Sequence, residues 1–288
     1  MRLALGTAQF GADYGVASSS GIPTRAEVRK ILNLAWKAGI DTLDTASAYG
    51  NSEQVLGSIG ILNWNVVTKV PRYDIEPESV RSWLFSHVQN SLKMLKVDHI
   101  HGLLLHDPSA LLKSSGRDLA EALIELRGSG AVKNIGFSIY SPDILPSLIA
   151  ILRPDLIQAP LNIFDQRIIR SGWLDRLTSE GIEVDVRSIF LQGLLIMEPN
   201  NRPSYFDKWA EVFNPWDCFV DKSGDSRVAT CLKFIGQHEN VSRVITGIDN
   251  IAHLEQLLEV HRSPAAIGLN DLYCNDSRLI DPFNWKLE

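Results

Sequence analysis

Short apolar segments alternate with longer amphipathic segments along nearly the whole chain. The short segments are almost continuously apolar, which is typical of parallel strands buried on both faces. They cover residues 2–6, 41–45, 65–70, 99–106, 132–138, 156–162, 183–190 and 241–247. The pattern therefore predicts eight strands of one parallel sheet.

The longer segments carry apolar residues at helical spacing. In the first of them, Val28, Ile31, Leu32 and Ala35 share one face, and Gly39 marks the end of the helix. The predicted helices cover residues 25–39, 52–60, 78–95, 117–130, 141–152, 171–181, 226–238 and 251–260. One predicted helix therefore follows each predicted strand.

Eight strand–helix units in a chain of this length are the signature of a closed (β/α)8 barrel, the TIM barrel. No break in composition divides the chain, so we predict a single barrel domain over residues 1–288. A doubly wound open sheet is the alternative fold. The glycines after the first strand, at positions 6, 11 and 15, do not have the GxGxxG spacing of that alternative.

Two stretches lack a clear period and are expected to be irregular: residues 191–225 and the tail after His261. The first follows the seventh strand, so it should lie over the C-terminal mouth of the barrel. Its aromatic residues are Trp209, Phe213, Trp216 and Phe219. They either cover a functional site or pack the loop onto the barrel, and the sequence leaves both interpretations open.

Composition narrows the class of protein. The net charge of −6 and the lack of clustered Lys and Arg argue against a nucleic-acid partner. No apolar stretch approaches the ~18 residues of a membrane span, and the N-terminus has no signal-peptide pattern. Cys218, Cys231 and Cys274 are widely spaced, which favours reduced thiols. We therefore expect a cytoplasmic protein with no membrane or nucleic-acid contact; the oligomeric state stays open.

Polar side chains gather where the predicted strands end, which is where barrel active sites lie. They are Asp44, Lys69, His106, Ser138, Gln158, Asn162, Arg187 and Ser188, with Tyr49 in the loop after the second strand. Asp13 and Tyr14, in the first loop, either line a substrate pocket or are solvated.

Lys69 is the residue that most needs an explanation, because it lies inside the apolar run VVTKV. Burying an unpaired ammonium costs several kcal/mol, so we expect Asp44 on the adjacent strand to pair with it. A nearby ammonium favours a phenolate, which would make Tyr49 a better proton donor near neutrality. His106 would add a second hydrogen bond to the same oxygen. These four predicted catalytic residues suit protonation of a carbonyl as hydride arrives.

At these residues the sequence resembles the aldo-keto reductase family. The motifs LDTASAYGNSE, VVTKV, LLLHDP, IGFS, IQAPLN and VITGIDNIAHLEQLLE occur in the family order over almost the entire chain. The resemblance implies NADP- or NAD-dependent reduction of an aldehyde or ketone to the alcohol, or the reverse, with Tyr49 as general acid/base. It implies cofactor contacts at Thr7, Asp44, Ser138, Gln158, Arg187, Ser188, Gly247, Asp249 and His253.

Several positions depart from the family pattern. Ile139 replaces the usual Asn, and Arg187 stands where an aromatic residue commonly stacks on nicotinamide. A guanidinium can stack on a ring, but its charge either weakens binding of the oxidised cofactor or pairs with an acidic substrate. At the adenosine end, Asp249 suits a free ribose hydroxyl, and His253 is the only candidate cation for a 2′-phosphate. NAD and NADP therefore both stay open.

Two other functions remain as alternatives. A nicotinamide-binding sensor or regulatory protein with little turnover would also explain Arg187 and the altered adenosine turn. A metal-dependent hydrolase would use His99 and His101, but these begin the fourth strand, at the opposite end from His106, so we predict no metal site. The substrate is expected to be a small carbonyl or alcohol, with a lean toward sugars or acidic carbonyl compounds.

Overall fold

The computed structural model describes residues 2–12, 21–73, 79–261, 268–269 and 271–287. Its strands are all parallel and close into a barrel in sequence order, with β8 pairing back onto β1. They are β1 (Leu3–Gly6), β2 (Thr42–Asp44), β3 (Asn65–Val70), β4 (Ile100–Leu105), β5 (Val132–Ser138), β6 (Leu156–Pro160), β7 (Glu183–Arg187) and β8 (Arg243–Gly247). The predicted (β/α)8 barrel and all eight predicted strands are confirmed. Asp13 and Tyr14 lie outside the described residues.

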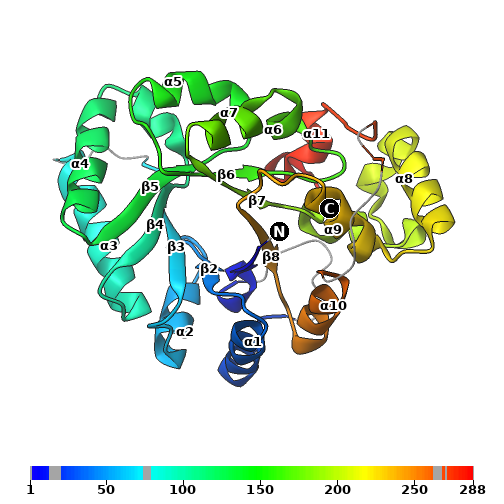
Figure 1. The fold of residues 1–288 in the computed structure, drawn as a ribbon, viewed down its shortest axis with the longest axis horizontal. Helices are drawn as coiled ribbons and strands as arrows, with labels where there is room; N and C mark the ends of the chain where they lie inside the picture. Colours follow the sequence, from blue (N-terminus) through cyan, green and yellow to red (C-terminus); the bar gives the residue numbers. More distant parts are fainter. Residues whose placement is uncertain (1, 13–20, 74–78, 262–267, 270, 288) are drawn as a thin grey trace.

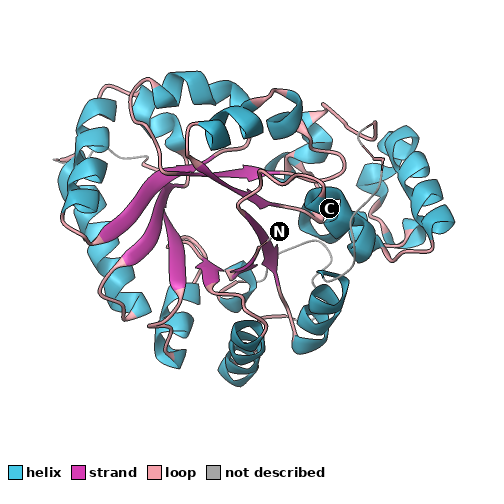
Figure 2. Ribbon diagram, in the orientation of Figure 1, coloured by secondary structure: helices cyan, strands magenta, loops and turns pink. Residues whose placement is uncertain are grey.

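Helices surround the strands as an outer layer (Figures 1 and 2). They are α1 (Arg25–Lys37), α2 (Ser52–Ile59), α3 (Val80–Leu95), α4 (Gly116–Gly128), α5 (Leu145–Ile149), α6 (Arg167–Arg170), α7 (Trp173–Ser179), α8 (Ala210–Ser223), α9 (Arg227–Gly236), α10 (Ile251–His261) and α11 (Ser277–Ile280). Thr24 begins α1 with a capping box that also uses Glu27. Within the described part of the chain, no helix has the length and apolar character needed to cross a bilayer.

The main hydrophobic core lies between the strands and the helices, whereas the barrel interior also holds charged side chains. Val184 and Val186 of β7 are fully buried in the main core. Because side chains alternate along a strand, Glu183, Asp185 and Arg187 point the other way, into the barrel. A small cluster of Val67, Leu104 and Leu156 forms a separate apolar group. The interior therefore holds charged groups close to the strand ends.

The expectation of an irregular stretch over residues 191–225 is wrong. This stretch contains α8 and three short 3-10 helices, at Leu191–Ile196, Pro199–Asn201 and Ser204–Trp209. Trp216 is fully buried and donates from Nε1 to the carbonyl oxygen of Leu195, at 3.2 Å. Phe213 packs edge-on against Phe164, with ring centroids 5.2 Å apart. The structure therefore favours packing of these aromatics over covering of a site. The tail also contains a short helix, α11.

Gly136 of β5 offers a test of this strand packing. A Cβ added at Gly136 would overlap the carbonyl oxygen of Leu156 on β6, so Gly136→Ala should lower the free energy of unfolding by at least about 2 kcal/mol. Gly128→Ala is the matched control, because no atom lies within 4 Å of the added methyl at the end of α4. That change should stabilise the protein by up to about 1 kcal/mol. Equal melting temperatures for Gly136→Ala and the wild type would contradict the packing.

Candidate active site

The predicted ion pair between Lys69 and Asp44 is present at the C-terminal ends of β3 and β2. Nζ of Lys69 lies 2.8 and 2.7 Å from the two carboxylate oxygens of Asp44, and it donates to the carbonyl oxygen of Thr45 at 2.9 Å. Three acceptors therefore match the three N–H donors of an ammonium. Burial is the largest single effect and would lower the pKa of Lys69, but the charge of Asp44, the phenol of Tyr49 and the hydrogen bond to Asp44 together raise it, so the side chain stays charged.

Tyr49 stands on a tight turn directly after β2. Its N–H donates to the carbonyl oxygen of Ala46, and its own carbonyl oxygen accepts from the N–H of Ser52. Gly50 has a φ of +56°, and a Cβ there would overlap the carbonyl oxygen of Gly11, so this turn requires glycine. The ring of Tyr49 faces the ammonium of Lys69, with Nζ 5.1 Å from its centroid. The turn thus holds the phenol next to the buried cation.

His106 follows β4 and packs edge-on against Tyr49. The ring centroids are 5.9 Å apart and the planes are at 84°. Burial lowers the pKa of His106 to about 4, helped by the positive charges of Lys69 and Arg187. The imidazole is therefore neutral near pH 7, with one nitrogen able to donate and the other to accept. The structure brings all four predicted catalytic side chains together.

Asp44 is held in place from several strands. Gln158 of β6 donates from Nε2 to Oδ1 of Asp44 at 2.7 Å, across the barrel. Thr7, directly after β1, donates from its N–H and from Oγ1 to the carbonyl oxygen of Asp44, at 2.9 and 3.0 Å. Ser138 of β5 is the register partner of Gln158 and is equally buried. The Asp44 carboxylate is thus held by β3 and β6, and its backbone carbonyl is held by the residue that follows β1.

A cavity of about 370 Å³ opens beside these residues. Of the predicted site residues, it is lined by Thr7, Asp44, Tyr49, Arg187, Ser188, Gly247, Asp249 and His253. It runs from the phenol of Tyr49 along the ends of β1, β7 and β8 to the start of α10. Ser138 and Gln158, predicted as cofactor contacts, are buried and do not line it. The shape suits an elongated ligand with one end at Tyr49.

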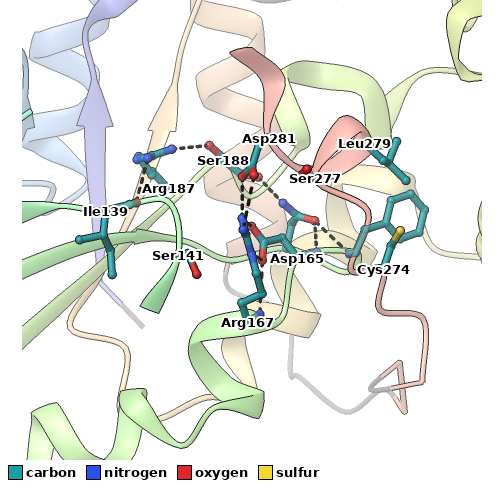
Figure 3. A network of polar contacts seen from close by, with 12 residues as sticks. Ile139, Ser141, Asp165, Arg167, Arg187, Ser188, Cys274, Ser277, Leu279 and Asp281 are labelled. Atoms are coloured by element: carbon teal, nitrogen blue, oxygen red, sulfur yellow. Dashed lines mark hydrogen bonds and ion pairs between the residues drawn. The ribbon is translucent and has the colours of Figure 1, made fainter. Parts of the chain in front are cut away.

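Arg187 ends β7 and lines this cavity, and Figure 3 shows its contacts with Ser188 and Ile139. Its guanidinium donates to Oγ of Ser188 at 3.2 Å and to the carbonyl oxygen of Ile139 at 3.1 Å. It also lies 4.4 Å from the ring centroid of Tyr140. Among the described residues, no carboxylate pairs with it. Arg187 thus contributes an uncompensated positive charge to the cavity.

The loop after β7 has an unusual backbone. Ser188, Leu191 and Gln192 have φ angles of 58°, 48° and 54°, in the left-handed region. Residues with a Cβ adopt this region at a cost of about 1–2 kcal/mol each. Asn162, after β6, fastens the loop by donating from Nδ2 to the carbonyl oxygen of Ser188 at 3.0 Å. Ser188 and Gln192 line the cavity, whereas Leu191 and Asn162 do not.

The C-terminal tail is tied to the same end of the barrel (Figure 3). Arg167 lies between Asp165, at 2.7 Å, and Asp281 of the tail, at 2.6 Å. The tail also places Phe283 against Tyr140, with ring centroids 4.8 Å apart. Since Tyr140 stacks on Arg187, the tail contributes to the surroundings of the cavity. No local pattern predicts this contact, because Arg167 and Asp281 are 114 positions apart.

Asp249 and His253 lie at the far end of the cavity. Oδ2 of Asp249 is 3.5 Å from Nδ1 of His253, and accepting a hydrogen bond from the imidazole raises the pKa of that imidazole. Oδ1 of Asp249 is buried and has no hydrogen-bond partner among the described residues. A buried acceptor that lines a cavity and lacks a donor fits a ligand hydroxyl.

The remaining histidines of the described segments lie apart from one another. His101 stands near the start of β4 beside Asn134, and the described residues contain no cluster of three or more His, Cys, Asp or Glu side chains able to hold a metal.

The sequence analysis did not single out Asp185 of β7, a carboxylate inside the barrel that is 1% exposed. The alternation E-V-D-V-R was a usable signal, because it places every second residue of β7 inside the barrel.

Comparisons with known proteins agree with this geometry. Residues 2–264 match the model of the Aldo/keto reductase family. The chain is 25% identical over 277 residues to the uncharacterized oxidoreductase YqkF of Bacillus subtilis (strain 168), covering 88% of this chain and 89% of YqkF. It is 26% identical over 189 residues to L-glyceraldehyde 3-phosphate reductase of Escherichia coli (strain K12), covering 58% of this chain and 54% of that protein.

Solved structures share the fold at lower identity. Aldo-keto reductase AKR11C1 from Bacillus halodurans, in its holo form, superposes with a TM-score of 0.73 at 21% identity, covering 93% of this chain and 89% of that one. Glycerol dehydrogenase AKR11B4 from Gluconobacter oxydans gives 0.71 at 20% identity, covering 100% and 94%. Since the family model spans nearly the whole sequence, this protein belongs to the aldo/keto reductase family.

Proposed function

We propose that this protein reduces an aldehyde or ketone to the alcohol with a reduced nicotinamide cofactor, or catalyses the reverse oxidation. The observation that carries the proposal is the buried Lys69–Asp44 pair facing the ring of Tyr49. Such a pair is costly to bury, and here it is placed where it can act on a phenol. The neutral imidazole of His106 packs against the ring of the same tyrosine.

The residues that line the cavity fit a dinucleotide. When bound, the reduced nicotinamide supplies a hydride to the carbonyl carbon. Thr7, Ser188 and Gly247 line the cavity. Oδ1 of Asp249, which also lines it, has no hydrogen-bond donor among the described residues. These residues would hold such a cofactor.

In the proposed mechanism, Tyr49 gives its proton to the carbonyl oxygen. The Lys69 ammonium favours the negative charge left on the phenol, and Asp44 keeps that ammonium charged and in place. His106 is neutral, so it can donate a hydrogen bond to the same oxygen without supplying a charge. In the reverse direction, the phenolate of Tyr49 takes the proton of the alcohol and becomes a phenol again.

Tyr49→Phe tests this role. The change removes the proton donor and keeps the ring, so turnover should fall roughly 10²–10⁴-fold. Cofactor affinity, measured by fluorescence titration, should stay within a few fold. Tyr273→Phe is the matched control, because Tyr273 packs on Arg170, outside the cavity, and should keep full activity. Near-normal turnover by Tyr49→Phe would refute the role of Tyr49 as proton donor.

Tight cofactor binding by the wild type without reduction of any carbonyl in a broad panel would favour the alternative of a nicotinamide-binding sensor.

We further propose that NADH is preferred over NADPH. A carboxylate at Asp249 attracts a ribose hydroxyl and repels a 2′-phosphate. The nearby cation, His253, is already engaged by Asp249, and Asn250 accepts the N–H of His253 at the start of α10. Both features leave fewer groups for a phosphate.

Asp249→Asn tests this preference. The variant removes the charge that repels a phosphate and weakens the hydrogen bond to the ribose. The dissociation constant for NADPH, divided by that for NADH, should therefore fall by about tenfold or more. Fluorescence titration of both cofactors gives the ratio. An unchanged ratio would mean that Asp249 does not read the ribose.

Arg187 leads us to propose an anionic carbonyl substrate, bearing a carboxylate or phosphate. Its guanidinium lines the cavity with Tyr49 and has no carboxylate partner among the described residues. A relative of this chain, the Escherichia coli reductase, is named for a phosphorylated aldehyde. An unpaired guanidinium near the reacting carbonyl would bind such a group through charge-assisted hydrogen bonds.

Arg187→Gln tests the substrate class. For a carbonyl compound with a carboxylate or phosphate, kcat/KM should fall about 10–100-fold, because a charge-assisted hydrogen bond is lost. For a neutral analogue, kcat/KM should stay within about threefold. Arg187→Lys should recover part of the loss. Equal losses for the charged and neutral compounds would show that Arg187 serves the cofactor instead.

A further inference from the structure

Two buried oxygen atoms inside the barrel lack hydrogen-bond partners among the described residues: Oε1 of Gln158 and Oδ2 of Asp185. The two residues are 0% and 1% exposed. They are also register partners on the adjacent strands β6 and β7. Both side chains enter the barrel, since Gln158 reaches Asp44 on β2 and Asp185 reaches Arg243 on β8. The two unsatisfied atoms therefore belong to neighbouring side chains.

A single proton would satisfy both atoms. The oxygen of an amide only accepts hydrogen bonds, and an ionised carboxylate also only accepts them. Two adjacent buried acceptors without donors are unfavourable. A protonated carboxylic acid, in contrast, has an O–H that can donate to the amide oxygen. Its other oxygen can still accept the bond from Arg243, which measures 3.2 Å.

We propose that Asp185 is a neutral carboxylic acid in the folded protein, that it donates from Oδ2 to Oε1 of Gln158, and that it is thereby a positioning residue for Asp44. The bond to Oε1 fixes the amide, so that its NH2 group points at Asp44. Asp44 in turn holds Lys69 beneath Tyr49. The catalytic part of this inference rests on the proposed function.

The charges around Asp185 agree with a neutral acid. Burial, together with the negative charges of Glu183 and Asp44, raises its pKa to about 7 against the lowering effect of Arg243. Arg243 is shared, because Glu183 holds the same Nη1 at 2.6 Å. The cation therefore compensates two carboxylates and does not fully neutralise Asp185.

The proposal predicts how the activity depends on pH. Above neutral pH, Asp185 loses its proton and turns a carboxylate toward the carbonyl of Gln158, which loosens the contact with Asp44. Asp185→Asn keeps a donor for Gln158 and an acceptor for Arg243, and it does not titrate. At pH 6, kcat of this variant should be within about twofold of wild type. The ratio of variant to wild-type kcat should rise toward roughly tenfold at pH 8, where a group with a pKa of 7 is about nine-tenths ionised.

Two further variants frame this comparison. Asp185→Val removes the donor at every pH, so kcat should fall about tenfold or more across the range. Glu183→Gln changes the same ion-pair group without touching Gln158, and it should keep the wild-type shape of the profile, displaced toward lower pH. A Glu183→Gln profile that loses its pH dependence, as Asp185→Asn should, would overturn the proposal.

A second measurement does not need turnover. In the unfolded chain Asp185 should titrate near its ordinary value of about 3.9. Between about pH 4 and pH 7 the folded state then binds one more proton than the unfolded state, so stability falls as pH rises. The melting temperature of wild type relative to Asp185→Asn should fall across this window and level off above it. Infrared difference spectra of the two proteins at pH 6 should show the carbonyl band of a protonated acid.

The results separate the two proposals. A wild-type melting temperature that rises with pH relative to Asp185→Asn, or the absence of the protonated-acid band, would show an ionised Asp185 and overturn the inference. Equal losses of kcat in Asp185→Asn and Asp185→Val would overturn the positioning role. If the melting and infrared results hold but no carbonyl compound is reduced, the neutral acid stands and the proposed reductase function fails.

Discussion

The ion pair between Lys69 and Asp44 is the interaction on which the rest of the site depends. Both groups are almost completely buried, so neither can exchange its partner for water. Removing one member of such a pair leaves an uncompensated charge, which costs about 3–5 kcal/mol. The carbonyl oxygen of Thr45 and the amide of Gln158 contribute the remaining hydrogen bonds of the pair, and Thr7 holds the backbone of Asp44. The barrel places these donors and acceptors on different strands, and the closed sheet keeps them in register.

Much of this arrangement could be predicted because it follows from local patterns. Continuous apolar runs predicted every strand, since parallel strands buried on both faces need them. A lysine inside such a run predicted its own counterion, because burial makes an unpaired ammonium too costly. Helix α8 was missed although Phe213, Trp216 and Val220 have helical spacing. Pro215, inside that helix, removes one backbone donor, and the buried aromatic side chains compensate.

The parts that escaped prediction depend on pairing between distant segments. Arg167 joins Asp281 only because the chain returns to the mouth of the barrel, and no local pattern records this. Gln158 donates from its amide nitrogen to Asp44, a partner 114 positions away that no local pattern indicates. Asp185 lies next to Gln158 because of the register between β6 and β7, which the sequence of either strand alone does not predict. Long-range geometry, and not residue type, decides these contacts.

The left-handed backbone at Ser188, Leu191 and Gln192 has a consequence for how this protein can change. Glycine at any of these positions would relieve unfavourable backbone geometry, because it has no Cβ. The same glycine would let the segment sample other shapes, and the wall of the cavity would have to be reordered each time a ligand enters. Thermal robustness and tight recognition therefore favour opposite substitutions at Ser188 and Gln192, whereas the buried side chain of Leu191 serves both.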